Sequence, residues 1–151
     1  MIVIPEQAKE IMMTDAVAAY PDECCGFFFG TEADTGDRLI TEVHPVVNAK
    51  EGDKRRRFEI SPLDYLRAEQ YAEESGLLVL GIYHSHPDHP AIPSETDRVA
   101  AQPWFSYLIL SVMHGKVEAI RSWRLNEGHQ FEEETIHESG RPEVGKTGRN
   151  K

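Results

Sequence analysis

One continuous apolar run is prominent in the hydrophobic pattern of this chain. Residues 77–83 read Leu-Leu-Val-Leu-Gly-Ile-Tyr, with Gly76 before them and a proline-rich stretch after them. An unbroken apolar run of this length between chain breakers is typical of a strand that is buried on both faces. The sequence therefore predicts a central strand here, with the polar residues from His84 onward at its end.

Helical periodicity occurs in three places. Between residues 5 and 20 apolar residues recur every three or four positions, which predicts an amphipathic helix that ends at a proline. A second helix should begin with Ser61 as N-cap and Pro62 in the first turn, and it should end at Gly76. A short third helix is expected to start at Ser94.

Further strands are expected where apolar and aromatic residues lie between turn signals. They cover residues 23–30, 38–47, 57–60, 107–112, 116–125 and 130–137. The strands 107–112 and 116–125 should form a hairpin through His114-Gly115. Helices interleaved with strands predict an α/β sandwich around a mixed sheet, as one domain over residues 1–138. Residues 139–151 are poor in apolar side chains, and we expect them to be a flexible tail.

Composition narrows the class of protein and of partner. A chain of 151 residues can form one domain with a substantial core. Cys24 and Cys25 are adjacent and cannot form an ordinary disulfide, which suits a reducing compartment. The net charge of −10 argues against nucleic acid as the main partner. Because no segment has the pattern of a membrane span or a signal peptide, we expect a cytoplasmic protein that binds no membrane. The sequence does not indicate an oligomeric state.

Residues 54–57 are a basic run, Lys-Arg-Arg-Arg, in this acidic chain. Such a run is either a solvated surface or a docking site for an anionic tail or an acidic partner, and the sequence leaves both open. The two cysteines are expected to pack in the core, because their neighbours are phenylalanines rather than the basic, half-exposed setting that a catalytic thiol needs.

Two histidines and an aspartate are the candidates for chemistry. His84 and His86 occupy alternate positions at the end of the predicted central strand, so their side chains point to the same face. Ten residues separate His86 from Asp97, which lies in the first turn of the short third helix. Two imidazoles and one carboxylate are the ligands of a catalytic zinc ion that keeps its fourth position for water. The sequence therefore predicts one Zn²⁺ site at these three residues.

Two further residues are candidates for catalytic roles. Ser94-x-x-Asp97 is a capping-box pattern, but the Ser94 hydroxyl could instead donate a hydrogen bond to a developing oxyanion. We expect these roles to compete for the same oxygen atoms. Hydrolysis also needs a general base, and Glu23 is a candidate because it directly precedes an apolar strand. The alternative for Glu23 is an acid at the turn that ends a helix.

These residues together resemble the JAMM (MPN-plus) metalloprotease family, in its small bacterial stand-alone form. The resemblance rests on His84-Ser85-His86-Pro87, Asp97 after ten intervening residues, Ser94, and an upstream segment Pro21-x-Glu23-x-Cys25-Gly26-x-Phe28-x-Gly30. It covers most of residues 1–125. It implies a three-layer, cytidine-deaminase-like α/β sandwich with a largely antiparallel sheet, although the deaminase signature itself is absent. It also implies zinc at His84, His86 and Asp97, Glu23 as the base and Ser94 as the oxyanion donor.

The resemblance further implies a substrate and a partner. Stand-alone bacterial members cleave a peptide or isopeptide bond at or after the C-terminal Gly-Gly of a ubiquitin-like sulfur-carrier protein. Residues 57–60 are the edge at which we expect such an extended tail to add as a strand, with the basic run beside it. The alternative is a non-catalytic MPN-type binding or scaffold module that docks a protein partner without turnover.

Overall fold

The structure is a computed structural model that describes residues 1–138. The predicted tail, residues 139–151, lies outside the described residues. The helices are α1 (Glu6–Ala19), α2 (Pro62–Ser75) and α3 (Glu95–Ala100). The strands are β1 (Ile2–Ile4), β2 (Cys25–Glu32), β3 (Arg38–Val46), β4 (Leu78–Pro87), β5 (Ser106–Met113), β6 (Lys116–Leu125), β7 (Phe131–Glu134) and β8 (Ile136–Glu138).

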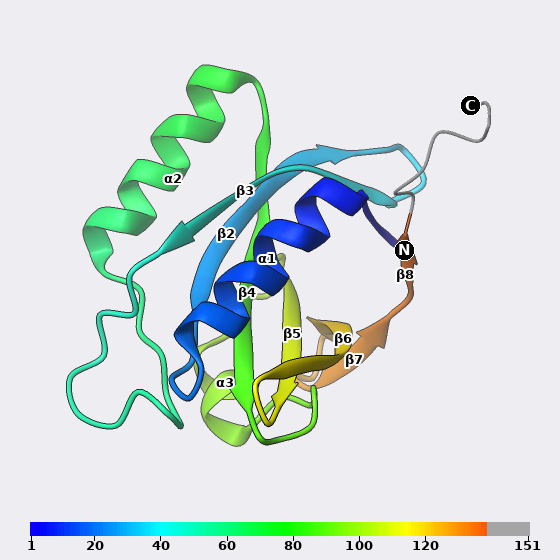
Figure 1. Cartoon of the computed structure of the whole chain (residues 1–151). Coiled ribbons are helices and arrows are strands. Elements are labelled where there is room, and N and C mark those ends of the chain that lie inside the picture. Colours follow the sequence, from blue (N-terminus) through cyan, green and yellow to red (C-terminus); the bar gives the residue numbers. More distant parts are fainter. Residues whose placement is uncertain (139–151) are drawn as a thin grey trace.

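The strands form one mixed sheet in the order β7-β6-β5-β4-β2-β3-β1-β8. The pairs β2–β3, β2–β4, β5–β6 and β6–β7 are antiparallel, whereas β4–β5, β1–β3 and β1–β8 are parallel. Although β7 and β8 are the two ends of this order, only Thr135 separates them along the chain. The sheet therefore curls until one continuous segment joins both of its edges (Figure 1).

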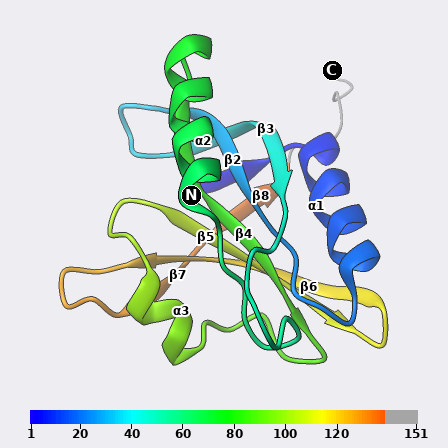
Figure 2. The same ribbon diagram turned by 90° about the vertical axis from the view of Figure 1, so that its left-hand side faces the viewer.

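Helices cover both faces of the sheet, which confirms the predicted three-layer α/β sandwich. Figure 2 shows α1 on one side and α2 with α3 on the other. Ala8, Met12 and Ala16 of α1 pack in one core with Phe28 and other sheet residues. Alanines of α2 pack in a second core, with side chains that point to the other face of the sheet. Side chains that alternate along β2 and β4 thus contribute to the two cores in turn.

The second helix and the central strand follow the sequence pattern closely. Ser61 caps α2 by accepting a hydrogen bond from the Asp64 backbone N–H at 3.1 Å, and Gly76 ends the helix in the left-handed conformation with φ +70°. The predicted central strand is β4, which lies inside the sheet between β5 and β2. The predicted hairpin turn is also present, because His114 and Gly115 both have positive φ.

Some local features differ from the sequence predictions. The single strand expected at residues 130–137 is two strands, β7 and β8. Residues 57–60 form no strand, because their backbone groups bond elsewhere: the Asn48 side chain binds the N–H of Glu59 and the C=O of Arg57, and the Ala49 N–H binds the C=O of Glu59. The short β1 was not predicted. Strand β2 begins at Cys25, so Glu23 lies in the turn before it.

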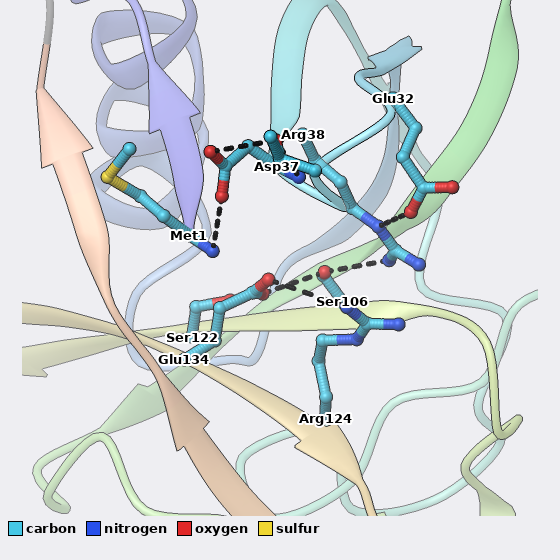
Figure 3. A network of polar contacts seen from close by, with 9 residues as sticks. Met1, Glu32, Asp37, Arg38, Ser106, Ser122, Arg124 and Glu134 are labelled. Carbon is cyan, nitrogen blue, oxygen red and sulfur yellow. Dashed lines mark hydrogen bonds and ion pairs between the residues drawn. The ribbon is translucent and has the colours of Figure 1, made fainter.

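A buried polar network joins the strands inside the curled sheet (Figure 3). The Arg38 side chain is buried, and its guanidinium donates to Glu32 at 3.1 Å and to the Ser106 hydroxyl at 2.9 Å. The hydroxyls of Ser106 and Ser122 in turn donate to Glu134 at 2.8 and 3.0 Å. The network therefore connects β2, β3, β5, β6 and β7. In the described part of the chain, no helix is long and apolar enough to cross a membrane.

Candidate metal centre

The three predicted ligands meet at one point. The Nε2 atoms of His84 and His86 are 3.2 Å apart, and the Asp97 Oδ2 atom is 3.3 Å from the first and 3.2 Å from the second. Ligand atoms that surround a tetrahedral zinc at bond lengths of about 2.0–2.1 Å are about 3.3 Å from one another. The three atoms thus have the spacing of one face of a tetrahedron, and the set can hold a metal ion.

The sheet and the following loop orient the histidines. Both side chains leave β4 on the same face, whereas the Ser85 hydroxyl accepts a hydrogen bond from the Cys24 N–H. The His86 Nδ1 atom is 2.9 Å from the Pro90 carbonyl oxygen, so a neutral imidazole donates there and keeps its Nε2 lone pair for the cluster. The His84 ring stacks on Phe58, with the ring centroids 4.5 Å apart. Ring packing and backbone contacts therefore hold both nitrogens in position.

The capping box and the metal centre share Asp97. Ser94 N–H donates to Asp97 Oδ2 at 2.8 Å, and Asp97 N–H donates to Ser94 Oγ at 3.0 Å. The capping box that the sequence predicts is therefore present, and it fixes the carboxylate. A hydroxyl that accepts a hydrogen bond can still donate its own proton, so the oxyanion role of Ser94 stays a prediction.

Charges and burial set the protonation state of the three ligands. Burial alone would raise the pKa of Asp97, but His84, His86 and the Ser94 N–H hold it well below its usual range. Burial lowers the pKa of His84 although Asp97 opposes this. For His86 burial acts in the same downward direction, but hydrogen bonds to Asp97 and Pro90 outweigh it and raise the pKa. An ionised carboxylate beside two imidazoles is the state that binds a divalent cation.

The Glu23 side chain lies on the same side of the candidate metal cluster as His86 and Ser94. Its side chain is buried and lines a hollow of about 360 Å³ together with these two residues. Its backbone is tied on both sides, since its N–H donates to the Lys54 carbonyl at 2.7 Å and its C=O accepts from Asn48 Nδ2 at 3.1 Å. Burial raises the pKa of Glu23 to about 8, against the opposite influence of His86. The structure thus holds a carboxyl group in the hollow that adjoins the ligands.

A second hollow lies on the other side of the ligands. It has a volume of about 180 Å³, and His84 and Asp97 contribute to its wall. Most of its lining is apolar or aromatic: Phe58, Ile60, Tyr65, Ile82, Ala100 and Tyr107. The three ligands therefore stand between an apolar hollow and the hollow that contains Glu23.

Sequence reasoning missed Asn48. Its side-chain amide makes four hydrogen bonds, from Nδ2 to the carbonyls of Glu23 and Arg57 and from the N–H groups of Lys50 and Glu59 to Oδ1. A lone asparagine in a polar loop has no distinctive spacing, so only the tertiary structure identifies it. It joins the loop after β3 to Glu23 in the segment before β2.

The cysteines occupy the two cores, as predicted. Cys24 and Cys25 are free and buried, and they lie in different core clusters. Burial raises the pKa of the Cys25 thiol to about 12 and that of Cys24 even further. Neither thiol forms a nucleophilic thiolate near neutral pH.

Comparison with known proteins identifies relatives. Residues 5–126 match the family model described as prokaryotic homologs of the JAB domain. A desampylase of Haloferax volcanii is 37% identical over 92 residues, which are 60% of this chain and 63% of that protein's length. A CysO-cysteine peptidase of Mycobacterium tuberculosis is 30% identical over 135 residues, 88% of each chain. The solution structure of a Desulfitobacterium hafniense protein superposes with a TM-score of 0.82 at 31% identity, covering 96% of this chain and 97% of the other.

Proposed function

This chain belongs to the family of prokaryotic homologs of the JAB domain, and we propose on that basis that it is a zinc-dependent peptidase or isopeptidase. Its substrate would be a ubiquitin-like sulfur-carrier protein, cleaved at or after the C-terminal Gly-Gly. Relatives named desampylase and CysO-cysteine peptidase support a hydrolase of this class. The observation that carries the proposal is the tetrahedral spacing of His84 Nε2, His86 Nε2 and Asp97 Oδ2. The free buried cysteines are consistent with action in the cytoplasm.

His84, His86 and Asp97 would hold the zinc ion. A zinc ion there would polarise the scissile carbonyl and lower the pKa of a water molecule towards neutrality. The protein itself supplies an ionised carboxylate and two oriented imidazoles, whose geometry is set by Pro90, Phe58 and the α3 cap described above. This preorganisation keeps the ligand geometry from depending on the substrate.

Glu23 is the proposed general base. It accepts a proton from the attacking water and later delivers it to the nitrogen of the leaving amine. Its fixed backbone and buried position limit the directions in which the carboxyl can point. Ser94 is the proposed oxyanion donor, because a hydroxyl whose oxygen caps α3 can still donate its proton.

A narrow substrate tail such as Gly-Gly fits the approach to the candidate metal centre. The acyl half of the substrate would lie on the side of the apolar hollow, beside the extended residues 57–60. These residues are not part of a sheet, so an incoming Gly-Gly segment would pair with an isolated extended stretch rather than with an existing edge strand.

Metal analysis and cleavage of a fusion substrate test the proposed function. Wild-type protein should bind one zinc ion and cleave a sulfur-carrier protein that carries a reporter after its Gly-Gly. Glu23→Gln should keep zinc and lose about 100-fold or more in kcat, whereas His84→Ala should lose both. Glu69→Gln, at an exposed position of α2, is the matched control and should change neither.

The alternative is a metal-containing scaffold that docks a partner without turnover. It would be favoured if zinc-loaded protein bound the carrier but cleaved no carrier fusion, with identical behaviour in the Glu23→Gln variant.

A further inference from the structure

The basic run Lys54–Arg57 borders the hollow that contains Glu23. Arg55, Arg56 and Arg57 all line this hollow, opposite His86 and Ser94. Its volume of about 360 Å³ is in the range of small-ligand sites. The run is thus part of the wall of the site and not only a solvated surface.

The loop that carries the arginines is anchored. Asn48 Nδ2 donates to the backbone carbonyls of both Glu23 and Arg57 at 3.1 Å, and the Glu23 N–H donates to the Lys54 carbonyl at 2.7 Å. The backbone of the base and the backbone of the arginines are therefore fixed to each other. A loop held in this way presents its side chains at a defined distance from the reacting groups.

The side of the hollow that the arginines line is positively charged, whereas the protein as a whole is negatively charged. The whole chain has a net charge of −10, yet three consecutive arginines line the hollow. Within residues 1–138, no carboxylate lies within ion-pair distance of Arg55, Arg56 or Arg57. The acids nearby are Glu23 itself and Asp53, which accepts a hydrogen bond from the Arg55 backbone N–H. A positive wall in an acidic protein attracts an anionic ligand group.

The chemistry of hydrolysis decides which half of the substrate enters this hollow. The water oxygen bonds to the carbonyl carbon, the C–N bond breaks with its electron pair remaining on nitrogen, and that nitrogen takes the proton held by Glu23. The second proton of the water also goes to the nitrogen, so the products are a new carboxylate on the carrier and an ammonium group on the released half. The Glu23 side chain lines the hollow that the arginines border. The leaving nitrogen must therefore lie in this hollow to receive the proton from Glu23.

We propose that Arg55, Arg56 and Arg57 form a carboxylate-binding subsite for the leaving group. The inference rests on the proposed function and narrows its substrate class: the enzyme releases a C-terminal amino acid with a free α-carboxylate in preference to a lysine side chain of a conjugated protein. In an amino acid the carboxylate is one carbon away from the leaving nitrogen, and guanidinium groups bind a carboxylate with paired hydrogen bonds. The ε-nitrogen of a lysine has no such neighbouring anion.

Two substrates that differ by one charge test the subsite. A carrier protein ending in Gly-Gly-Ala is compared with the same protein bearing a C-terminal carboxamide, and kcat/KM is measured for each. Wild type should prefer the free acid by roughly 10- to 100-fold, the effect of one charge-assisted hydrogen bond. In Arg57→Ala and in the double variant Arg55→Ala/Arg56→Ala this ratio should fall towards one. Arg67→Ala, an exposed arginine of α2, is the matched control and should keep the wild-type ratio.

Binding provides a readout that is independent of turnover. Calorimetry with Glu23→Gln protein and a synthetic tail peptide ending in Gly-Gly-Ala should show tighter binding of the free acid than of the amide. The difference should shrink as salt is added, because ions screen the arginines.

The outcomes separate the two proposals. Equal kcat/KM for acid and amide in wild type, or faster cleavage of a lysine isopeptide, overturns the subsite and leaves the proposed hydrolase intact. If no carrier is cleaved, the proposed function fails. The peptide measurement then decides the subsite: an acid preference that is lost in the arginine variants supports it, and equal binding overturns it.

Discussion

At the scale of single residues, one atom joins the fold to the chemistry. Asp97 Oδ2 accepts the Ser94 N–H that completes the cap of α3 and also faces both histidine Nε2 atoms. The hydrogen bonds that cap the start of α3 therefore also orient the Asp97 carboxylate toward the two histidines. Ser94 has a corresponding double role in the proposed function, because its oxygen accepts the cap hydrogen bond and the residue also lines the hollow that contains Glu23.

Ser94→Ala separates the cap from the oxyanion role. Loss of the cap should lower the free energy of unfolding by about 1 kcal/mol, and loss of the oxyanion donor should raise the activation free energy by roughly 2–4 kcal/mol. Thermal unfolding and kcat measure the two effects. Ser61→Ala removes the equivalent cap of α2 and should change stability alone, because Ser61 lines neither hollow. Equal kcat values for both variants would contradict the oxyanion role.

Glu23→Gln should stabilise the metal-free protein in a pH-dependent way. Burial raises the Glu23 pKa from 4.5 to about 8, so the folded state binds this proton up to a higher pH than the unfolded state does. Wild-type stability should therefore fall as pH rises from about 4.5 to 8, and then level off. Gln cannot ionise, so the variant should become more stable than wild type by on the order of 3 kcal/mol at pH 8. Denaturant unfolding in chelator at pH 5 and pH 8 measures this difference, and a constant gap would contradict it.

At the scale of elements, the site depends on a loop that has no regular structure. Residues 57–60 lie beside His84 and Asp97, and Asn48 binds two of their backbone groups, the Arg57 C=O and the Glu59 N–H. The Asn48 side chain thus supplies hydrogen bonds that pairing with a neighbouring strand would otherwise have supplied. With this arrangement the backbone of the loop lies near β4. The hollow that Glu23 lines stays open.

Asn48→Ala should loosen this loop. Four backbone groups lose their partners, and the basic run behind them becomes more open to local unfolding. Limited digestion with trypsin should then cut within Lys54–Arg57 several-fold faster than in wild type, and kcat/KM should fall. Asn126→Ala removes an asparagine with comparable loop contacts on the far hairpin and should leave the Lys54–Arg57 cleavage rate unchanged. Unaltered digestion in Asn48→Ala would show that the tether is dispensable.

At the scale of the whole molecule, the curled sheet is closed by its last segment and by the Arg38 network. The guanidinium of Arg38 lies 3.8 Å from the centre of the Trp104 ring. It also donates hydrogen bonds to Glu32 and Ser106 (Figure 3). Burial lowers its pKa, and Glu32 opposes this shift. A charge enclosed in this way is stable only while its partners stay in place.

Arg38→Ala should destabilise the protein by about 3–5 kcal/mol, because it removes the donor to the Ser106 hydroxyl and one of the positive charges near the buried Glu134. Arg38→Met should cost less, since it fills the space with an apolar chain. Thermal unfolding measures both. Arg124→Ala, which removes a half-exposed partner 3.9 Å from Glu134, should cost below about 1 kcal/mol. A similar loss in all three variants would argue against a network centred on Arg38.

The sequence by itself determined the elements whose signals are local. The cap and end of α2, the apolar run of β4 and the His114-Gly115 turn depend on neighbouring residues, and they form where the pattern predicts. The same holds for the three side chains that could hold a metal ion, those of His84, His86 and Asp97. Alternate positions on one strand share a face, and a capped helix start fixes where a nearby carboxylate points.

Only the tertiary structure decided which distant residues share the site. Glu23 and the arginines come from different turns and loops, and they meet because β2 pairs with β4 and because Asn48 binds both backbones. The closure of the sheet through β7 and β8 likewise depends on its curvature. Such contacts are not encoded in spacing along the chain, since they depend on how the strands pair, twist and pack over the whole domain.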